Sequence, residues 1–197
     1  MATHPPQAVL SLEKVSVCYT RRARRRAHCD FFALKQLSFD LLKGETLGVI
    51  GRNGAGKSTL LRLLAGIIAP DHGKVVNTGA RASLLSLQVG FVPHLTGREN
   101  AVLSGILLGM HPRDIKANMG NIIEFAEIGE SIDSPLKTYS TGMRARLGFA
   151  VCFLADPEIL LVDEVLGVGD IEFRRKSSGL LKERIKSHRT AVLVSHN

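Results

Sequence analysis

The residues best suited to chemistry are a lysine, a serine and a threonine that follow a glycine-rich segment. Residues 51–59 read Gly-Arg-Asn-Gly-Ala-Gly-Lys-Ser-Thr and fit the pattern G-x-x-x-x-G-K-[ST]. Glycine adopts backbone conformations that other residues avoid, so successive N–H groups can turn inward around phosphate oxygens. The segment therefore predicts a phosphate-binding loop for a nucleotide.

Each residue type in this loop has an expected role. Lys57 is expected to reach the β- and γ-phosphates, the Ser58 hydroxyl to bind Mg²⁺, and Thr59 to add a phosphate hydrogen bond. A helix that begins near Lys57 would add the positive end of its dipole. The predicted nucleotide-contacting residues of the loop are Gly51, Asn53, Gly54, Ala55, Gly56, Lys57, Ser58 and Thr59.

Two apolar segments must position this loop. Residues 46–50 read as a buried strand before it, and residues 60–68 carry Leu61, Leu64 and either Ile67 or Ile68 at helical spacing. Strand, loop and helix in this order are the context that the motif requires. A chance match in a glycine-rich turn is therefore the weaker alternative.

A pair of carboxylates follows a second short apolar run. Residues 159–162 predict a buried strand, and Asp163 and Glu164 come directly after it. Asp163 would hold Mg²⁺ through water, and Glu164 would direct the attacking water at the γ-phosphate. An Asp-Glu pair alone is equally consistent with solvated charges at a strand end. The phosphate loop makes catalysis the favoured interpretation.

A capped helix is predicted between the loop and the carboxylates. Residues 139–143 read Tyr-Ser-Thr-Gly-Met, and residues 144–155 continue as a helix for which Ser140 is the expected N-cap. The apolar face of this helix consists of Leu147, Val151 and Leu154. Taken alone, this segment predicts only an amphipathic helix.

Together these motifs resemble the nucleotide-binding subunit of an ATP-binding cassette (ABC) transporter, over residues 12–197. The resemblance implies ATP and Mg²⁺ as cofactors and an ATPase activity coupled to transport. In that family a Leu-Ser-Gly-Gly-Gln signature stands where this chain has residues 139–143, and only Ser140 and Gly142 are kept. The resemblance implies that these two residues contact the γ-phosphate held by a partner subunit.

Four further positions receive roles from the resemblance. Tyr19 is similar to the aromatic residue that stacks on adenine, with an ordinary surface tyrosine as the alternative. His196, after the strand-like residues 190–195, is similar to the switch histidine at the γ-phosphate, and Asp170 lies in the expected crossing loop to the other subunit. Gln88, about one residue out of register, is assigned to the glutamine that senses Mg²⁺ and the transmembrane partner, or else to a strand edge.

The expected site thus has two further sets of residues. The predicted catalytic residues are Glu164, His196 and Lys57. The predicted metal-binding residues are Ser58, Asp163 and Gln88.

Several motifs resemble the branch of this family that exports surface polysaccharides such as O-antigen, capsule or teichoic acid. They are residues 139–143, 163–170, 95–100 and 171–176. This resemblance implies a peripheral protein at the cytoplasmic face of the bacterial cytoplasmic membrane, with a second copy of itself in a head-to-tail dimer and a multi-spanning permease as partners. The alternatives are a soluble cassette ATPase acting on nucleic acid or ribosomes, and a non-hydrolysing ATP-binding scaffold.

Length and composition allow one sizeable α/β core, since the chain has 197 residues and is 45% apolar. The resemblance predicts a single nucleotide-binding domain over residues 1–197 with a P-loop NTPase core built on a parallel sheet. An antiparallel β subdomain is expected from the N-terminal region and residues 75–91, and a helical subdomain that carries the signature from residues 95–150. Related domains continue beyond the switch histidine, so a C-terminally shortened cassette is expected.

The charge of the chain points to an anionic partner or to a solvated loop. The formal net charge is +8, and residues 21–26 contribute five arginines to it. Such a run is attracted to anionic lipid headgroups or to nucleic acid. Because the resembled family docks beneath a membrane subunit, an anionic membrane surface is preferred to nucleic acid, which is not expected, and a solvated loop is the other alternative.

Membrane insertion and disulfides are not predicted. No apolar run approaches the roughly 18 residues that a spanning helix needs, and the first residues lack a signal-peptide core. Cys18, Cys29 and Cys152 are odd in number and lack metal-like spacing, which favours three reduced thiols.

Overall fold

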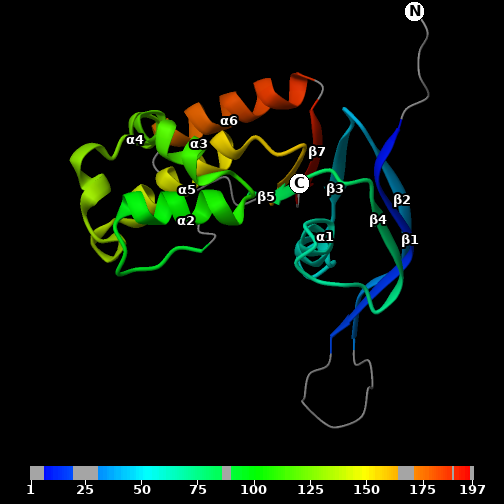
Figure 1. The fold of residues 1–197 in the computed structure, drawn as a ribbon. Coiled ribbons are helices and arrows are strands. Elements are labelled where there is room, and N and C mark those ends of the chain that lie inside the picture. The colour runs from blue at the N-terminus through cyan, green and yellow to red at the C-terminus, as the bar shows by residue number, and fades with distance from the viewer. Residues whose placement is uncertain (1–6, 20–30, 86–89, 164–170, 188, 196–197) are drawn as a thin grey trace, which may run out of the picture. The chain divides into compact units, whose positions relative to one another are not determined.

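The computed structural model describes residues 7–19, 31–85, 90–163, 171–187 and 189–195, and it forms two compact units (Figure 1). The first unit comprises residues 1–84, 158–164 and 184–197. The second comprises residues 85–157 and 165–183. The prediction that residues 1–197 act as one nucleotide-binding domain stays a prediction.

The first unit contains two sheets. The antiparallel sheet has the order β2-β1-β4 and consists of β1 (Ala8–Tyr19), β2 (Phe31–Leu42) and β4 (His72–Asn77). The parallel sheet has the order β3-β7-β6-β5 and consists of β3 (Thr46–Ile50), β5 (Ala82–Leu84), β6 (Ile159–Val162) and β7 (Thr190–Ser195). All four residues of β6 are buried, as its unbroken apolar sequence predicts.

One helix packs against both of these sheets. Helix α1 (Lys57–Leu64) contributes four buried leucines to a core shared with β1, β6 and β7. It ends in a Schellman motif, in which the Gly66 N–H donates to the Leu63 carbonyl at 3.0 Å and the Ile67 N–H to the Arg62 carbonyl at 2.9 Å. Gly66 allows this because its φ is +69°. The prediction that the helix extends to Ile67 or Ile68 is therefore wrong, and Ile67 is 62% exposed.

The second unit is helical. Its helices are α2 (Gly97–Leu107), α3 (Pro112–Ala117), α4 (Met119–Ala126), α5 (Thr141–Ala155), most of α6 (Ile171–Lys186), and the 3₁₀ helices η1 (Gly129–Asp133) and η2 (Leu136–Thr138). This confirms the expected helical segment that precedes the signature. Helix α5 lies at the centre of the core, since its predicted apolar residues Leu147 and Val151 are fully buried and Phe149 and Cys152 are buried as well.

The segment 171–176, which the sequence singled out without a physical role, anchors α6 within this unit. The ring of Phe173 meets the rings of Phe125 and Phe149 edge to face, at centroid distances of 5.9 and 5.6 Å. Lys176 pairs with Glu127 at 2.6 Å. The motif therefore holds α6 against α4 and α5.

Two predictions on the first unit need correction. Residues 75–91 were expected in the antiparallel layer, but β5 pairs parallel with β6, and only β4 joins the antiparallel sheet. A strand of three residues is too short for its sequence pattern to reveal the direction of pairing. Cys18 is disulfide-bonded, so the expectation of three reduced thiols is wrong there, whereas Cys152 is a buried, reduced thiol. Cysteine count and spacing do not report which side chains meet in the fold.

Thr96 is expected to stabilise the second unit through a capping box at the start of α2. Its Oγ1 accepts from the Glu99 N–H at 3.2 Å, and the Glu99 carboxylate accepts from the Thr96 N–H at 2.8 Å. We expect Thr96→Ala to lower the free energy of unfolding by about 1 kcal/mol in urea titrations at pH 7.

The same contacts set the pH dependence of this loss. The hydrogen bonds from Thr96 hold the pKa of Glu99 below its usual value, so their contribution is present above that value and is lost as the pH falls through the lowered one. Thr96→Ala keeps the backbone N–H and loses only the hydroxyl, so the part of the difference that the hydroxyl carries should shrink as the pH falls through the lowered pKa of Glu99. Thr138→Ala, which removes an exposed hydroxyl bonded to the Pro135 carbonyl, serves as the control. An equal loss in both variants at all pH values would contradict the capping role.

Candidate functional site

The phosphate loop connects β3 to α1 at the carboxyl end of the parallel sheet. The Gly51 N–H donates to the Ser195 carbonyl of β7 at 3.3 Å, which fixes the start of the loop on the sheet. Gly54 and Gly56 have φ values of +83° and +89°, a region that favours glycine. Gly56 is the N-cap of α1, and no side chain among the described residues caps this helix. The N–H groups of its first turn are therefore oriented for an anion.

Lys57 lies over this loop. Its Nζ donates to the carbonyls of Gly51 at 2.6 Å and of Arg52 at 3.1 Å. The ammonium group is thus held on the loop beside the start of α1. This is the position from which a lysine can neutralise phosphate charge.

Ser58 and Asp163, the two predicted metal ligands that the structure describes, lie together. The Ser58 hydroxyl donates to the Asp163 carboxylate at 3.1 Å, although the two residues come from α1 and from the end of β6. A hydroxyl and a carboxylate oxygen are ligands suited to Mg²⁺, which prefers oxygen and is held by few protein groups. The donor set therefore fits the ion that the sequence predicts.

Tyr19 lies beside the loop as well. Its hydroxyl is 3.5 Å from Thr59 Oγ1, and its side chain is 43% exposed at the end of β1. Phe31, its partner across the strands, and the adjacent Phe32 are also exposed, so three aromatic rings share this end of the antiparallel sheet. Phe31 lies directly across from Tyr19, whereas Phe32 is paired with Cys18 and points to the opposite face of the sheet.

The signature residues 139–143 lie in the second unit, at the start of α5. Ser140 caps α5, its Oγ accepting from the Met143 N–H at 3.1 Å, which confirms the predicted N-cap. A Cβ built on Gly142 would have only Ser140 Oγ within 4 Å among the described atoms, at 3.7 Å. The fold of the second unit therefore does not require glycine here, and the absent side chain leaves room at the positive end of α5.

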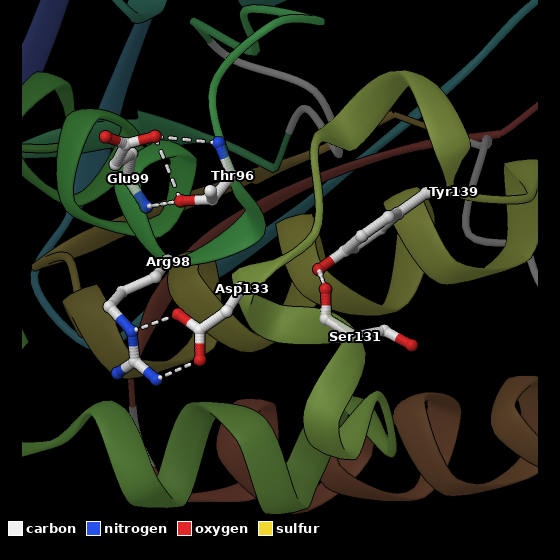
Figure 2. A network of polar contacts seen from close by, with 6 residues as sticks. All are labelled: Thr96, Arg98, Glu99, Ser131, Asp133 and Tyr139. Carbon is white, nitrogen blue, oxygen red and sulfur yellow. Dashed lines mark hydrogen bonds and ion pairs between the residues drawn. The ribbon is translucent and has the colours of Figure 1, made fainter.

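Tyr139, the first residue of the signature segment, belongs to a group of polar contacts between the start of α2 and η1 (Figure 2). Arg98 binds Asp133 with two hydrogen bonds of 2.8 and 3.0 Å, and this guanidinium holds the pKa of Asp133 below its usual range. Burial raises the pKa of the Tyr139 phenol, and the negative charge of Asp133 adds to the effect. Tyr139 therefore stays a neutral hydrogen-bond donor at physiological pH.

Several predicted residues lie outside the described residues. They are Gln88, Glu164, Asp170, His196 and the basic run 21–26. Their assigned roles stay predictions, as do the catalytic and binding roles of the residues that the structure does place.

The family is established by comparison with known sequences. The profile of the ABC transporter family matches residues 34–167, and this chain belongs to that family. Within it, the chain is 49% identical over 167 residues to the O-antigen export system ATP-binding protein RfbB of Klebsiella pneumoniae. It is 41% identical over 185 residues to the teichoic acids export ATP-binding protein TagH of Shouchella clausii. The predicted family, branch and ATPase class are thereby confirmed.

The extent of these matches differs between the relatives. The alignments cover 85% of this chain and 68% of RfbB, and 94% of this chain and 51% of TagH. The chain therefore spans about half to two thirds of the length of these relatives.

The fold agrees with solved cassettes. The dimeric ATP-binding cassette MJ0796, bound to ADP and Pi, superposes with a TM-score of 0.76 over 95% of this chain and 88% of that chain, at 23% identity. This confirms the predicted cassette fold with its parallel sheet, antiparallel sheet and helices. Across the described parts of the chain, no helix combines the length and apolarity needed to cross a bilayer.

Proposed function

We propose that this chain binds and hydrolyses ATP to energise export of a cell-surface polysaccharide or teichoic acid. The observation that carries the ATPase part is the meeting of Ser58 and Asp163 beside Lys57 at the uncapped start of α1. The export part is supported by the printed functions of the relatives, O-antigen export for RfbB and teichoic acid export for TagH. These names favour transport over the alternatives of a nucleic-acid ATPase or a scaffold.

The proposed chemistry uses the residues of the phosphate loop first. The N–H groups of the loop and of the first turn of α1 bind the phosphates, and Lys57 neutralises the β- and γ-phosphate charge. Ser58 and Asp163 hold Mg²⁺, which supplies further charge neutralisation when bound. Tyr19 stacks on the adenine, and Phe31, its partner across the strands, extends this aromatic surface. Glu164 orients the attacking water, and His196 contacts the γ-phosphate.

The proposed partners complete the site. Two copies pair head to tail, so that Ser140 and Gly142 of one copy contact the γ-phosphate held by the other. ATP closes this dimer and hydrolysis reopens it, and the change reaches a multi-spanning permease through residues 88–100. The chain then works as a peripheral subunit at the cytoplasmic face of the bacterial cytoplasmic membrane, where residues 21–26 can meet anionic lipid.

A mixing experiment tests the composite site. Glu164→Gln damages the site formed around its own phosphate loop, whereas Ser140→Arg damages the site of the partner. Each variant alone should turn over ATP very slowly, because both sites of its homodimer are damaged. A heterodimer retains one intact site, since a two-fold interface builds each site from the phosphate loop of one copy and the signature of the other, and both changes then fall in the same site. We expect the mixture to hydrolyse ATP well above the sum of the two separate rates.

Wild-type turnover per subunit should also rise with protein concentration, since each site needs two copies. The control mixes Glu164→Gln with Lys57→Met, two changes on the same side of the site, and should recover nothing. Wild-type turnover that is independent of concentration, together with no recovery in the first mixture, would contradict the head-to-tail dimer.

A further inference from the structure

Tyr139, the first residue of the signature segment, is buried and bonded through its phenol. Its side chain is 3% exposed, and its hydroxyl donates to the Ser131 carbonyl of η1 at 2.5 Å (Figure 2). A buried hydroxyl needs such a partner, because leaving it unpaired costs free energy. The resembled family has leucine at this position, which could fill the space but could not make this bond.

The phenol of Tyr139 packs closely against Gly97. A Cβ built on Gly97 would lie 2.1 Å from the Tyr139 hydroxyl oxygen and 2.9 Å from the ring carbon that carries it. Gly97 is the first residue of α2, and its N–H donates to the Ser134 carbonyl at 3.2 Å. The phenol is thus enclosed between the start of α2 and η1, and the absence of a side chain at Gly97 makes the space for it.

The main chain around Tyr139 carries this restraint to the signature. The Tyr139 carbonyl accepts from Arg144 Nε at 3.3 Å and from Arg144 Nη2 at 3.0 Å, one turn into α5. The next residue, Ser140, caps the same helix through the Met143 N–H. The residue before the cap is therefore held at its side chain and at its carbonyl, and the position of Ser140 follows from it.

Further hydrogen bonds connect α2 and the segment before it to η1 and η2. The Leu136 N–H donates to the Leu95 carbonyl and the Lys137 N–H to the Pro93 carbonyl, both at 2.8 Å. Arg98 of α2 binds Asp133 of η1 with two hydrogen bonds (Figure 2). Hydrogen bonds therefore join the start of α2, η1 and the signature segment to one another.

We propose that Tyr139 is a positioning residue, whose enclosed phenol sets the place of Ser140 and Gly142 for contact with the nucleotide of a second copy. The inference rests on the proposed function. Reacting and stabilising groups must be held closely in place, since a displacement of about 1 Å can cost about a hundredfold in rate. If Ser140 and Gly142 are held less firmly, the dimer should hydrolyse ATP more slowly. ATP binding at the phosphate loop of the same chain should not change.

The test compares Tyr139→Phe with the wild type in three measurements. Phenylalanine keeps the ring and removes only the hydroxyl that Ser131 accepts from. We expect kcat for Mg²⁺-dependent ATP hydrolysis to fall at least about tenfold, while the Kd for ATP, measured at a protein concentration where the chain is monomeric, stays unchanged. Amide exchange over residues 139–144 should become faster.

Ile122→Val is the matched control. Ile122 is 1% exposed in α4 and shares the core cluster of Tyr139, so this change should destabilise the same unit by an amount similar to the loss of one hydrogen bond while the Tyr139 hydroxyl stays in place. A loss of kcat in Tyr139→Phe that Ile122→Val does not share supports the inference. Equal kcat values in Tyr139→Phe and the wild type would overturn it and leave the proposed function standing.

The ATPase function and the positioning role of Tyr139 can also fail separately. If the wild type binds ATP but never turns it over, the proposed function fails, and amide exchange then decides the inference. Faster exchange over residues 139–144 in Tyr139→Phe than in Ile122→Val supports the restraint on Ser140. The same exchange in both variants overturns it.

Discussion

Replacing Gly56 by alanine is expected to weaken ATP binding severely. A Cβ at this position would lie 2.2 Å from the Ala33 carbonyl oxygen of β2 and 3.2 Å from a methyl carbon of Leu34. The obstacle is main chain in a paired strand, so the loop must move instead. Because Gly56 starts α1, this movement displaces the N–H groups that face the phosphates. Losing two charge-assisted hydrogen bonds weakens binding by at least about a hundredfold.

Gly54 provides the matched control for this change. Its φ of +83° is close to the +89° of Gly56, but a Cβ on Gly54 would have no described atom within 4 Å. Gly54→Ala therefore carries only the strain of a left-handed conformation, about 1 to 2 kcal/mol. Calorimetric titration with Mg²⁺ and ATP should find a much smaller loss of affinity for Gly54→Ala. Equal losses would show that the backbone conformation, and not the close approach to β2, decides binding.

The local parts of the site could be predicted because each lies within a short segment. The loop motif, the strand at residues 159–162 and the cap at Ser140 are all visible as residue types at fixed spacing, and the structure has each element there. The meeting of Ser58 with Asp163 was expected because both residues were assigned to Mg²⁺, and not from their spacing, since 105 residues separate them. Spacing in the sequence does not determine which strands become neighbours.

The parts that could not be predicted depend on close approach between distant segments. Nothing in the sequence near Gly56 indicates that the Ala33 carbonyl excludes a side chain there, and nothing near Gly97 indicates the phenol of Tyr139. The direction of β5 was missed because three residues carry no pattern, and the end of α1 because Gly66 was not recognised as its cap. The two close approaches and the pairing of β5 are contacts that tertiary structure alone creates, whereas the end of α1 is local and Gly66 was a readable stop signal.

Lys57→Met is expected to reduce ATP turnover by about 10² to 10³-fold, the cost of removing one group that stabilises charge in the transition state. Methionine keeps an unbranched side chain that is one heavy atom shorter, and it loses the charge and the hydrogen bonds of the ammonium group. The unfolding free energy should fall by about 1 kcal/mol, since within the described residues Nζ donates to the Gly51 and Arg52 carbonyls, at 2.6 and 3.1 Å, at a partly exposed site. Steady-state turnover and urea unfolding of the same preparation measure both quantities.

Lys74→Met, the same substitution on the exposed strand β4, controls for the loss of one positive charge from the unit. It should leave turnover unchanged, because Lys74 lies in the antiparallel sheet and has no place in the phosphate loop. Two roles of Lys57 are then separable, since holding the loop carbonyls affects folding whereas neutralising phosphate affects only the reaction. A large loss of stability with a proportional loss of turnover would assign Lys57 to the shape of the loop. A large loss of turnover with stability nearly kept assigns it to the chemistry, as the position of its ammonium group at the start of α1 predicts.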